Sequence, residues 1–198
     1  MSYQDIIDAR RSVYALNKEL PVSEDEAIKT IEDAIVASPS AFNMQSARAV
    51  ILLGTEHEAL WNGIVHDTLQ AIVPAEKFAP TASKLAGFAA GAGTVLFFED
   101  EAVVNQFKEQ FATYADAFDG FSAHGQGIAQ VNVWNALADK LVGANLQHYN
   151  PLIDNAVKVR WNVPASYRLV AQLVFGGIAA PAGNQQRQPA VDRVRVIR

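Results

Sequence analysis

The sequence predicts an α+β fold, in which helices surround one central mixed or antiparallel sheet. Amphipathic helical patterns alternate with short apolar runs, and half of the 198 residues are hydrophobic, which is enough for a sizeable core. Neither an internal repeat nor a low-complexity linker divides the sequence. We therefore expect one domain that spans residues 1–198.

The first two helices carry the clearest boundary signals. A short first helix follows Ser2, which is a suitable N-cap, and ends at the pair Arg10-Arg11. Ser23 and Glu26 form a capping-box pattern at the start of the second helix. This helix is expected to end at Ser38-Pro39, because the residue before a proline avoids the α region.

The remaining elements follow from the hydrophobic pattern. The run over residues 94–99 is apolar without alternation, which predicts a central strand covered on both faces. Residues 191–197 alternate apolar and basic side chains, a pattern typical of an edge strand. Further strands are expected at 47–54 and 169–175, and further helices at 56–73, 101–118, 127–146 and 152–161.

Composition excludes several classes of protein. The net charge of -5 and the pI near 5.3 leave no basic stripe for a nucleic acid, so we expect no such partner. The absence of cysteine excludes disulfides, thiolate nucleophiles and iron–sulfur clusters held by thiolates, so redox chemistry would need a bound cofactor. The N-terminus lacks a signal-peptide pattern and no apolar run could span a bilayer, so we expect a cytoplasmic protein without a membrane partner.

Three familiar patterns of catalytic or binding residues fail. Gly125-Gln126-Gly127 lacks the preceding strand and the third glycine of a dinucleotide fingerprint. His57-Glu58 has no second histidine four residues on, and His66 lies on the same helix, which we expect to be solvated, so no metal site is predicted. No Gly-x-Ser-x-Gly nucleophile elbow is present, which argues against a hydrolase.

Two polar segments carry the strongest functional signal, because each lies where a predicted helix ends. Arg10-Arg11-Ser12 offers two guanidinium groups and a hydroxyl that suit a phosphate. Within residues 38–45 (SPSAFNMQ), Ser40, Asn43 and Gln45 offer neutral groups for the edge of a planar heterocycle. Each segment also has a simpler interpretation: a solvated cationic helix end for the first, and a helix stop followed by a turn for the second.

In this order, the two segments resemble the FMN-binding elements of the nitroreductase-like flavin oxidoreductases. Finer similarity lies in RRSVYAL at 10–16, GTVLFFE at 93–99 and LQHYNP at 146–151. These segments resemble a small branch of the family that includes fungal proteins linked to fatty-acid repression and bacterial stress-induced relatives. The resemblance implies a nitroreductase-like α+β fold and an intertwined homodimer that binds FMN at the subunit interface.

The resemblance also implies roles for individual residues. It places Arg10, Arg11, Ser12 and Arg187 at the FMN phosphate or ribityl chain, and it takes Pro39, Ser40, Asn43 and Gln45 from the partner subunit. It places Gln147, His148, Tyr149 and Asn150 where backbone amides lie beside the reactive flavin edge. Tyr14 stands where many relatives carry a lysine at the pyrimidine edge, and Gln185 stands where another lysine meets the phosphate. Lys84 is the candidate for the missing positive charge.

The candidates for the wall of an acceptor pocket are Phe42, His124 and Tyr149. His124 is equally well explained as a surface histidine near the start of a helix. For Tyr149 and Trp134 the simpler interpretation is core packing, and we prefer it for Trp134 because its neighbours at helical spacing are apolar.

These assignments predict an FMN-dependent oxidoreductase. NADH or NADPH would give a hydride to FMN and leave, and a nitroaromatic, quinone or related electron-poor acceptor would then take the electrons in a ping-pong sequence. No side chain is assigned a catalytic role, because the flavin carries the chemistry. The main alternative is a flavin-binding regulatory or stress-sensor protein with little turnover. A structural protein, in which the two polar segments are coincidental, is a third interpretation.

Overall fold

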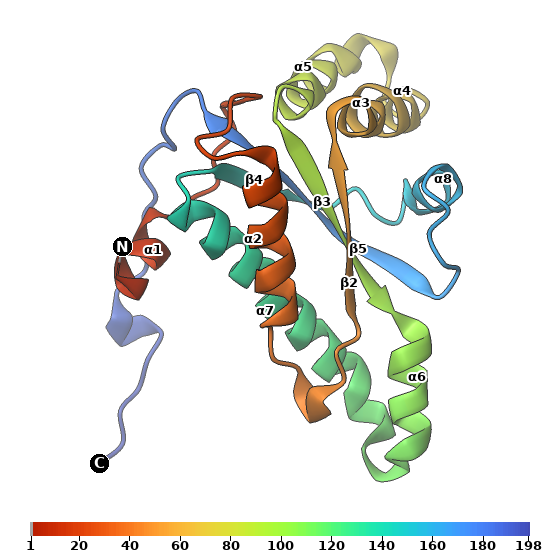
Figure 1. Cartoon of the computed structure of the whole chain (residues 1–198), viewed down its shortest axis with the longest axis vertical. Coiled ribbons are helices and arrows are strands. Elements are labelled where there is room, and N and C mark those ends of the chain that lie inside the picture. Colours follow the sequence, from red (N-terminus) through yellow and green to blue (C-terminus); the bar gives the residue numbers. More distant parts are fainter. Residues whose placement is uncertain (1) are drawn as a thin grey trace.

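The computed structural model describes residues 2–198 and arranges helices around a five-stranded sheet (Figure 1). The helices are α1 (Tyr3–Ala9), α2 (Glu24–Val36), α3 (Gly54–Glu58), α4 (His66–Gln70), α5 (Phe78–Ala89), α6 (Glu101–Gln110), α7 (Phe118–Asp139) and α8 (Asp154–Arg160). A π-helical segment, Ala59–Val65, joins α3 and α4 into one rod. The strands are β1 (Leu16–Asn17), β2 (Ala47–Leu53), β3 (Gly93–Asp100), β4 (Gly143–Gln147) and β5 (Tyr167–Ile178). Short 3₁₀ turns lie at Ala41–Asn43, Ala75–Lys77, Ala112–Ala117 and Ala190–Asp192.

The strands of the sheet pair in antiparallel fashion. β5 pairs with β3, and β3 pairs with β2, with Val95 opposite both Leu173 and Ile51. β4 also pairs with β5, and the short β1 pairs with the C-terminal end of β5. An isolated parallel bridge joins Ser12 to Ala144 of β4. This arrangement confirms the predicted α+β fold with a central sheet.

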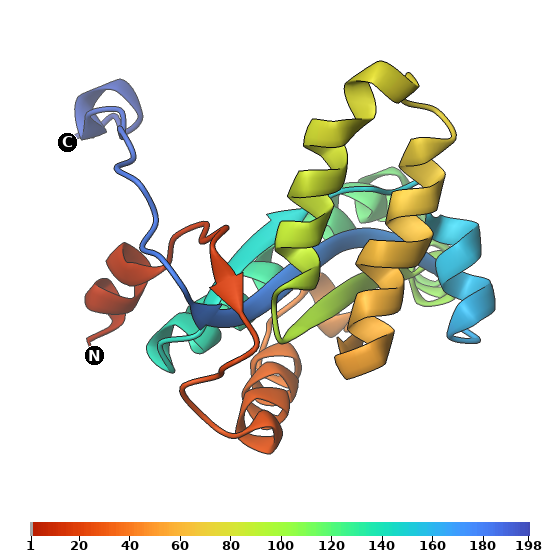
Figure 2. The same cartoon turned by 90° about the horizontal axis from the view of Figure 1, so that it is seen from above.

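Helices cover both faces of the sheet, and β3 is buried along its whole length. Figure 2 shows α5 and the α3–α4 rod on one side of the sheet and α2 on the other. Val95 and Phe97 pack against the core formed with α2 and α7. Leu96 and Phe98 belong to the opposite core, which includes Trp61 of the rod. The absence of alternation at 94–99 therefore predicted the two-sided cover correctly.

Serine side chains cap the predicted N-termini of α2 and α1. The Ser23 hydroxyl accepts a hydrogen bond from the Glu26 amide at 3.1 Å, which confirms the predicted cap. The Glu26 carboxylate instead bonds Lys140 at 2.7 Å, so the reciprocal half of the capping box is missing. A complete capping box forms at α1, where Ser2 and Asp5 bond each other's backbone amides.

The prediction of one helix over 127–146 is wrong at both ends. The helix α7 begins nine residues earlier, at Phe118, and ends at Asp139. Leu141 adopts a left-handed φ of 59°, and the Val142 amide donates to the Leu137 carbonyl, which closes the helix. The chain then enters β4, which was not predicted. The apolar residues of β4 continue the spacing of the helical stripe, so the sequence pattern does not mark where the helix ends.

Two further helical segments differ from the prediction. α5 was not predicted, and it contains a proline, a residue that normally interrupts a helix. Pro80 occupies the third position of α5, where the backbone amide would have no partner within the helix in any case. The helix predicted over 101–118 is shorter, since α6 ends at Gln110 and a 3₁₀ turn follows.

The edge strand predicted over 191–197 does not form within this chain. Residues 189–198, here called the C-terminal arm, contain only the turn Ala190–Asp192 and pair with no strand in the described part of the molecule. Val191, Val194, Val196 and Ile197 are 63% to 82% exposed. Figures 1 and 2 show the arm leaving the body near α1. An alternating segment becomes a strand only when another strand pairs with it.

His57 is buried, although its helix was expected to be solvated. Its side chain is 1% exposed, and its Nδ1 lies 2.9 Å from the hydroxyl of Thr94 on β3. Trp61 donates to the same hydroxyl at 2.9 Å. Burial lowers the pKa of His57, and this effect outweighs the opposing effect of the Ala89 and Phe88 carbonyls. The core therefore holds His57 in its neutral form.

We predict that this histidine makes the fold less stable in mild acid. The unfolded chain protonates His57 at its ordinary pKa of about 6.5, whereas the folded chain binds that proton only at lower pH. The neutral histidine therefore adds no penalty above its unfolded pKa. As the pH falls below that value toward the lower pKa of the folded state, the free energy of unfolding decreases. The melting temperature should drop more steeply between about pH 7.5 and about pH 5.5 in the unmodified protein than in His57→Asn. His124→Asn, which changes an exposed histidine, is the control, and parallel profiles for His57→Asn and the unmodified protein would refute the assignment.

Candidate cofactor site

Three guanidinium groups gather where α1 ends, and we call Arg10, Arg11 and Arg187 the arginine cluster. Arg11 donates to the Gly183 carbonyl at 2.5 Å, and Arg187 bonds Asp8 of α1 at 3.0 Å. These two bonds hold the chain after β5 against α1. Burial lowers the pKa of Arg10, and the charges of Arg187 and Arg11 lower it further. The cluster is therefore a region of concentrated positive charge.

Arg10 differs from the other two members of the cluster in its partner. Its guanidinium carbon lies 4.6 Å from the centre of the Trp134 ring on α7. Within residues 2–198, the Arg10 side chain makes no ion pair and donates no hydrogen bond. All of its N–H donors are thus available to an anion.

A buried polar network ties the arginine cluster to the sheet. Asn145 of β4 is fully buried, and its amide donates to the Val13 carbonyl at 2.8 Å. Gln147 donates to the side-chain oxygen of the same Asn145 at 2.8 Å. Ser12 and Tyr14, on either side of Val13, are exposed. The segment after α1 is therefore fixed through its backbone, while its alternate side chains face outward.

The residues that follow β4 are held by a second buried amide. Gln172 of β5 is fully buried and accepts a hydrogen bond from the Tyr149 amide at 2.8 Å. Its own amide group donates to Asn150 at 3.4 Å. The Tyr149 ring packs edge-on against Trp61 at 5.7 Å, and burial raises the pKa of its hydroxyl. The Tyr149 amide is thus already bonded, whereas His148 is exposed.

The segment after α2 forms a tight loop. The Ser40 hydroxyl accepts a hydrogen bond from the Gln45 amide at 2.8 Å, and the Gln45 side chain donates to the Asn43 carbonyl at 3.3 Å. Phe42, Asn43 and Gln45 all have positive φ, between 50° and 54°. Pro39 and Ser40 line a cavity of about 190 Å³, together with Gln45 and residues of α2, β2 and α7.

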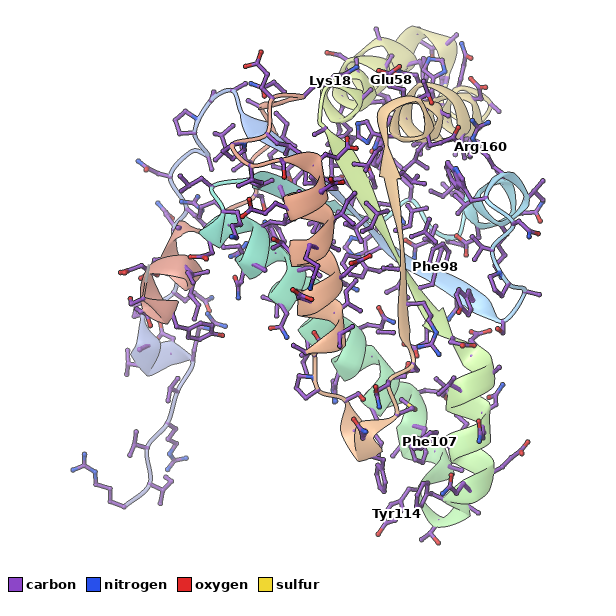
Figure 3. All side chains as sticks on the ribbon, viewed as in Figure 1. Lys18, Glu58, Phe98, Phe107, Tyr114 and Arg160 are labelled. Atoms are coloured by element: carbon purple, nitrogen blue, oxygen red, sulfur yellow. The ribbon has the colours of Figure 1, made fainter. Side chains whose placement is uncertain are left out.

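The loop places Phe42 in a group of aromatic rings. The Phe42 ring lies 4.9 Å from Phe111, 5.4 Å from Phe118 and 6.0 Å from Tyr114, between centres. Phe42 and Tyr114 are 47% and 53% exposed. Figure 3 shows Tyr114 at the lower end of the molecule, near Phe107. His124 is exposed on the N-terminal half of α7.

The remaining candidate, Lys84, lies on α5. Its ammonium nitrogen lies 5.6 Å from the centre of the Phe88 ring, and the residue is exposed. No ion pair of Lys84 exists within residues 2–198. The same part of the chain contains no group of three metal-ligating side chains and no helix long and apolar enough to cross a membrane.

The two polar segments contact opposite sides of α7. Asn132 donates to the Ser38 hydroxyl at 3.0 Å, whereas Trp134 lies against Arg10. Positions two apart on an α-helix project about 200° from each other. Within residues 2–198, Arg10 and Ser38 therefore contact α7 through side chains that point in different directions.

Comparison with known proteins identifies the family. A model of the nitroreductase family matches residues 7–177. This chain belongs to the nitroreductase family. The fold and the family that were expected from the two polar segments are thereby confirmed, and the chain is an oxidoreductase of that family.

Relatives match this nitroreductase over nearly its whole length. The HBN1 protein of Saccharomyces cerevisiae is 38% identical over 186 residues, which cover 93% of this chain and 92% of HBN1. The nitroreductase FRM2 of the same yeast is 35% identical and is aligned over 88% of this chain and 87% of its own. The structure of the nitroreductase CinD from Lactococcus lactis in complex with chloramphenicol is 48% identical, covers 100% of both chains and gives a TM-score of 0.92.

Three residues support the candidate site of this nitroreductase without having been predicted to do so, namely Asn145, Gln172 and Trp134. Asn145 and Gln147 alternate along β4, a strand signal that the predicted helix concealed. Gln172 is a polar residue inside the apolar run LVAQLVF, which marks a buried amide with partners. Trp134 was interpreted as core packing. It does pack beside the α2–α7 core, but it also contacts Arg10.

We predict that Asn145→Ala destabilises the fold. The change leaves the Val13 carbonyl and the Gln147 amide without their buried partner, which costs about 1–3 kcal/mol for each unsatisfied group. Urea unfolding followed by circular dichroism measures the loss. Lys29→Ala removes an exposed ion pair with Asp33 and should cost less than about 1 kcal/mol. Equal losses in the two variants would contradict the structural role of Asn145.

Proposed function

We propose that this protein is an FMN-dependent NAD(P)H oxidoreductase that reduces nitroaromatics, quinones or related electron-poor acceptors. The observation that carries the proposal is the arginine cluster, in which Arg10 offers every donor of a partly buried guanidinium to an anion. Guanidinium groups bind phosphate through paired, charge-assisted hydrogen bonds. The exposed Ser12 hydroxyl beside the cluster adds a neutral donor.

The donor set fits a mononucleotide. The arginine cluster suits one terminal phosphate, whereas FAD would present a linked diphosphate. When bound, FMN supplies the hydride and electron transfer that this cysteine-free chain lacks. The chain's own residues bind and orient it: Arg10, Arg11, Ser12 and Arg187 at the phosphate, and the buried Asn145 network beneath them. Tyr14 and Lys84 remain proposed contacts of the flavin ring, as do Gln147 and His148 after β4.

Solved relatives support the acceptor class. Structures of CinD hold chloramphenicol and 4-nitrophenol, which are both nitroaromatic compounds, and CinD is 48% and 47% identical to this chain in those structures. Another CinD structure holds nicotinic acid, whose pyridine ring resembles that of the nicotinamide donor. A nitroreductase from Desulfitobacterium hafniense with bound FMN shares the fold, with a TM-score of 0.72 at 16% identity.

The pocket wall is proposed to form from aromatic side chains. Phe42 and Tyr114 present half-exposed rings beside the loop at 38–45, and such rings stack on planar, electron-poor molecules. Exclusion of water and close approach of two flat rings serve hydride transfer more than a dedicated proton donor does. His124 and Tyr149 remain candidates for the same wall.

We predict ping-pong kinetics, because one pocket over the flavin must receive the nicotinamide and the acceptor in turn. Initial velocities with NADH or NADPH against a nitroaromatic or a quinone should give parallel double-reciprocal lines. Tyr149→Ala should change the acceptor efficiency more than the affinity for FMN. Intersecting lines would indicate a ternary complex and refute the shared pocket. A yellow protein without turnover would favour the regulatory alternative.

We also propose that the functional unit is a homodimer in which Pro39, Ser40, Asn43 and Gln45 of one subunit complete the site of the other. Within the described residues, β2 pairs only with β3, so its other edge has free backbone groups. A cavity of about 740 Å³ beside that edge is lined largely by apolar residues of α2 and β2. The C-terminal arm of the same chain carries exposed valines and lies elsewhere (Figure 1). The arm of a second copy could pair with the free edge of β2 and place its valines in the apolar cavity.

We predict that sedimentation detects a dimer and that the arm stabilises it. Val194→Ser combined with Val196→Ser removes apolar surface from one side of the arm and should raise the dissociation constant of the dimer. Arg195→Gln keeps the apolar residues and serves as the matched control. FMN should be released as the subunits separate. A flavin-loaded monomer would contradict the shared site.

A further inference from the structure

The contact between Arg10 and Trp134 separates Arg10 from every other arginine of its cluster. Arg187 is neutralised by Asp8, and Arg11 is fixed by the Gly183 carbonyl. Arg10 instead lies over an aromatic face at 4.6 Å, within the range of a cation–π interaction. A ring orients the guanidinium without occupying its N–H donors, whereas a carboxylate would occupy donors and compete with an incoming anion.

Trp134 is well placed to hold this geometry. It lies near the middle of the C-terminal half of α7, is partly buried and packs beside the core formed by α2 and α7. Its ring is therefore fixed by the fold. Arg10, by contrast, follows the last residue of α1 and has a flexible side chain that the ring restrains.

We infer that Trp134 is a positioning residue that fixes Arg10 for the phosphate of the bound cofactor. The inference rests on the proposed function and extends it to a residue that touches neither the phosphate nor the flavin ring. Ordering the guanidinium in advance reduces the entropy that binding would otherwise cost. Trp134 then contributes to the distinction between a phosphorylated flavin and riboflavin, which has no phosphate.

The test compares FMN and riboflavin. Flavin fluorescence is titrated with full-length protein freed of flavin, for the unmodified chain, Trp134→Leu, Trp134→Phe, Arg10→Ala and the double variant of Arg10→Ala with Trp134→Leu. Trp134→Leu should weaken FMN binding by about fivefold, a loss of the size expected for one cation–π contact, and should leave riboflavin binding within about twofold. Trp134→Phe keeps a smaller ring and should fall between, and it serves if the leucine variant does not fold.

A double-mutant cycle tests whether Trp134 acts through Arg10. In the Arg10→Ala background, Trp134→Leu should cause no further loss of FMN affinity, because the group that the ring positions is gone. Equal weakening of FMN and riboflavin, or additive losses in the double variant, would overturn the inference and assign Trp134 to packing alone. Failure of the unmodified protein to bind FMN would overturn the proposed cofactor and this inference together.

Discussion

Burial of β3 and β5 on both faces is the constraint on which the rest of the structure depends. Successive β3 residues alternate between two cores, Val95 and Phe97 on one side and Leu96 and Phe98 on the other. A shift of one residue in register would exchange these faces, so the pairing of β3 with β5 is strongly specified. The other edge of β5 then fixes β4, whose Asn145 and Gln147 support the segment after α1.

Two buried amides transmit this order from the sheet to the site. Gln172 on β5 holds the chain after β4, and Asn145 on β4 holds the chain after α1. Both amides are fully buried, so each would destabilise the fold if its hydrogen-bond partners were lost. The segments that they hold are loops, yet their backbones are fixed by side chains of the sheet. The polar residues exposed on these loops can therefore present a constant geometry to a ligand.

The predictable parts of the molecule are those with a local signal. The cap at Ser23, the helix stop before Pro39 and the apolar run of β3 each fix an element through neighbouring residues, and the structure confirms them. β4 and α5 were not predicted, because their signals depend on position. A proline such as Pro80 is compatible with a helix only in the first turn. The alternation of Asn145 and Gln147 indicates a strand only because β5 pairs with this segment. The role of Trp134 follows from a contact with Arg10 across the fold, for which its apolar neighbours in sequence give no sign.

The charges of the arginine cluster favour the proposed binding of an anion. Asp8 pairs with Arg187, and the charges of Arg187 and Arg11 still lower the pKa of Arg10, so the repulsion within the cluster is not fully offset by this one carboxylate. Asn145 fixes the backbone at Val13, close after the cluster in the sequence, and the Trp134 ring contacts Arg10 itself. An anion that binds there relieves the repulsion and thereby stabilises the folded chain. The proposed homodimer extends this reasoning to the loop at 38–45, where Ser38 bonds Asn132 and not the Trp134 ring that holds Arg10. A twofold axis would bring this loop of one chain to the arginine cluster of the other and so form two equivalent sites.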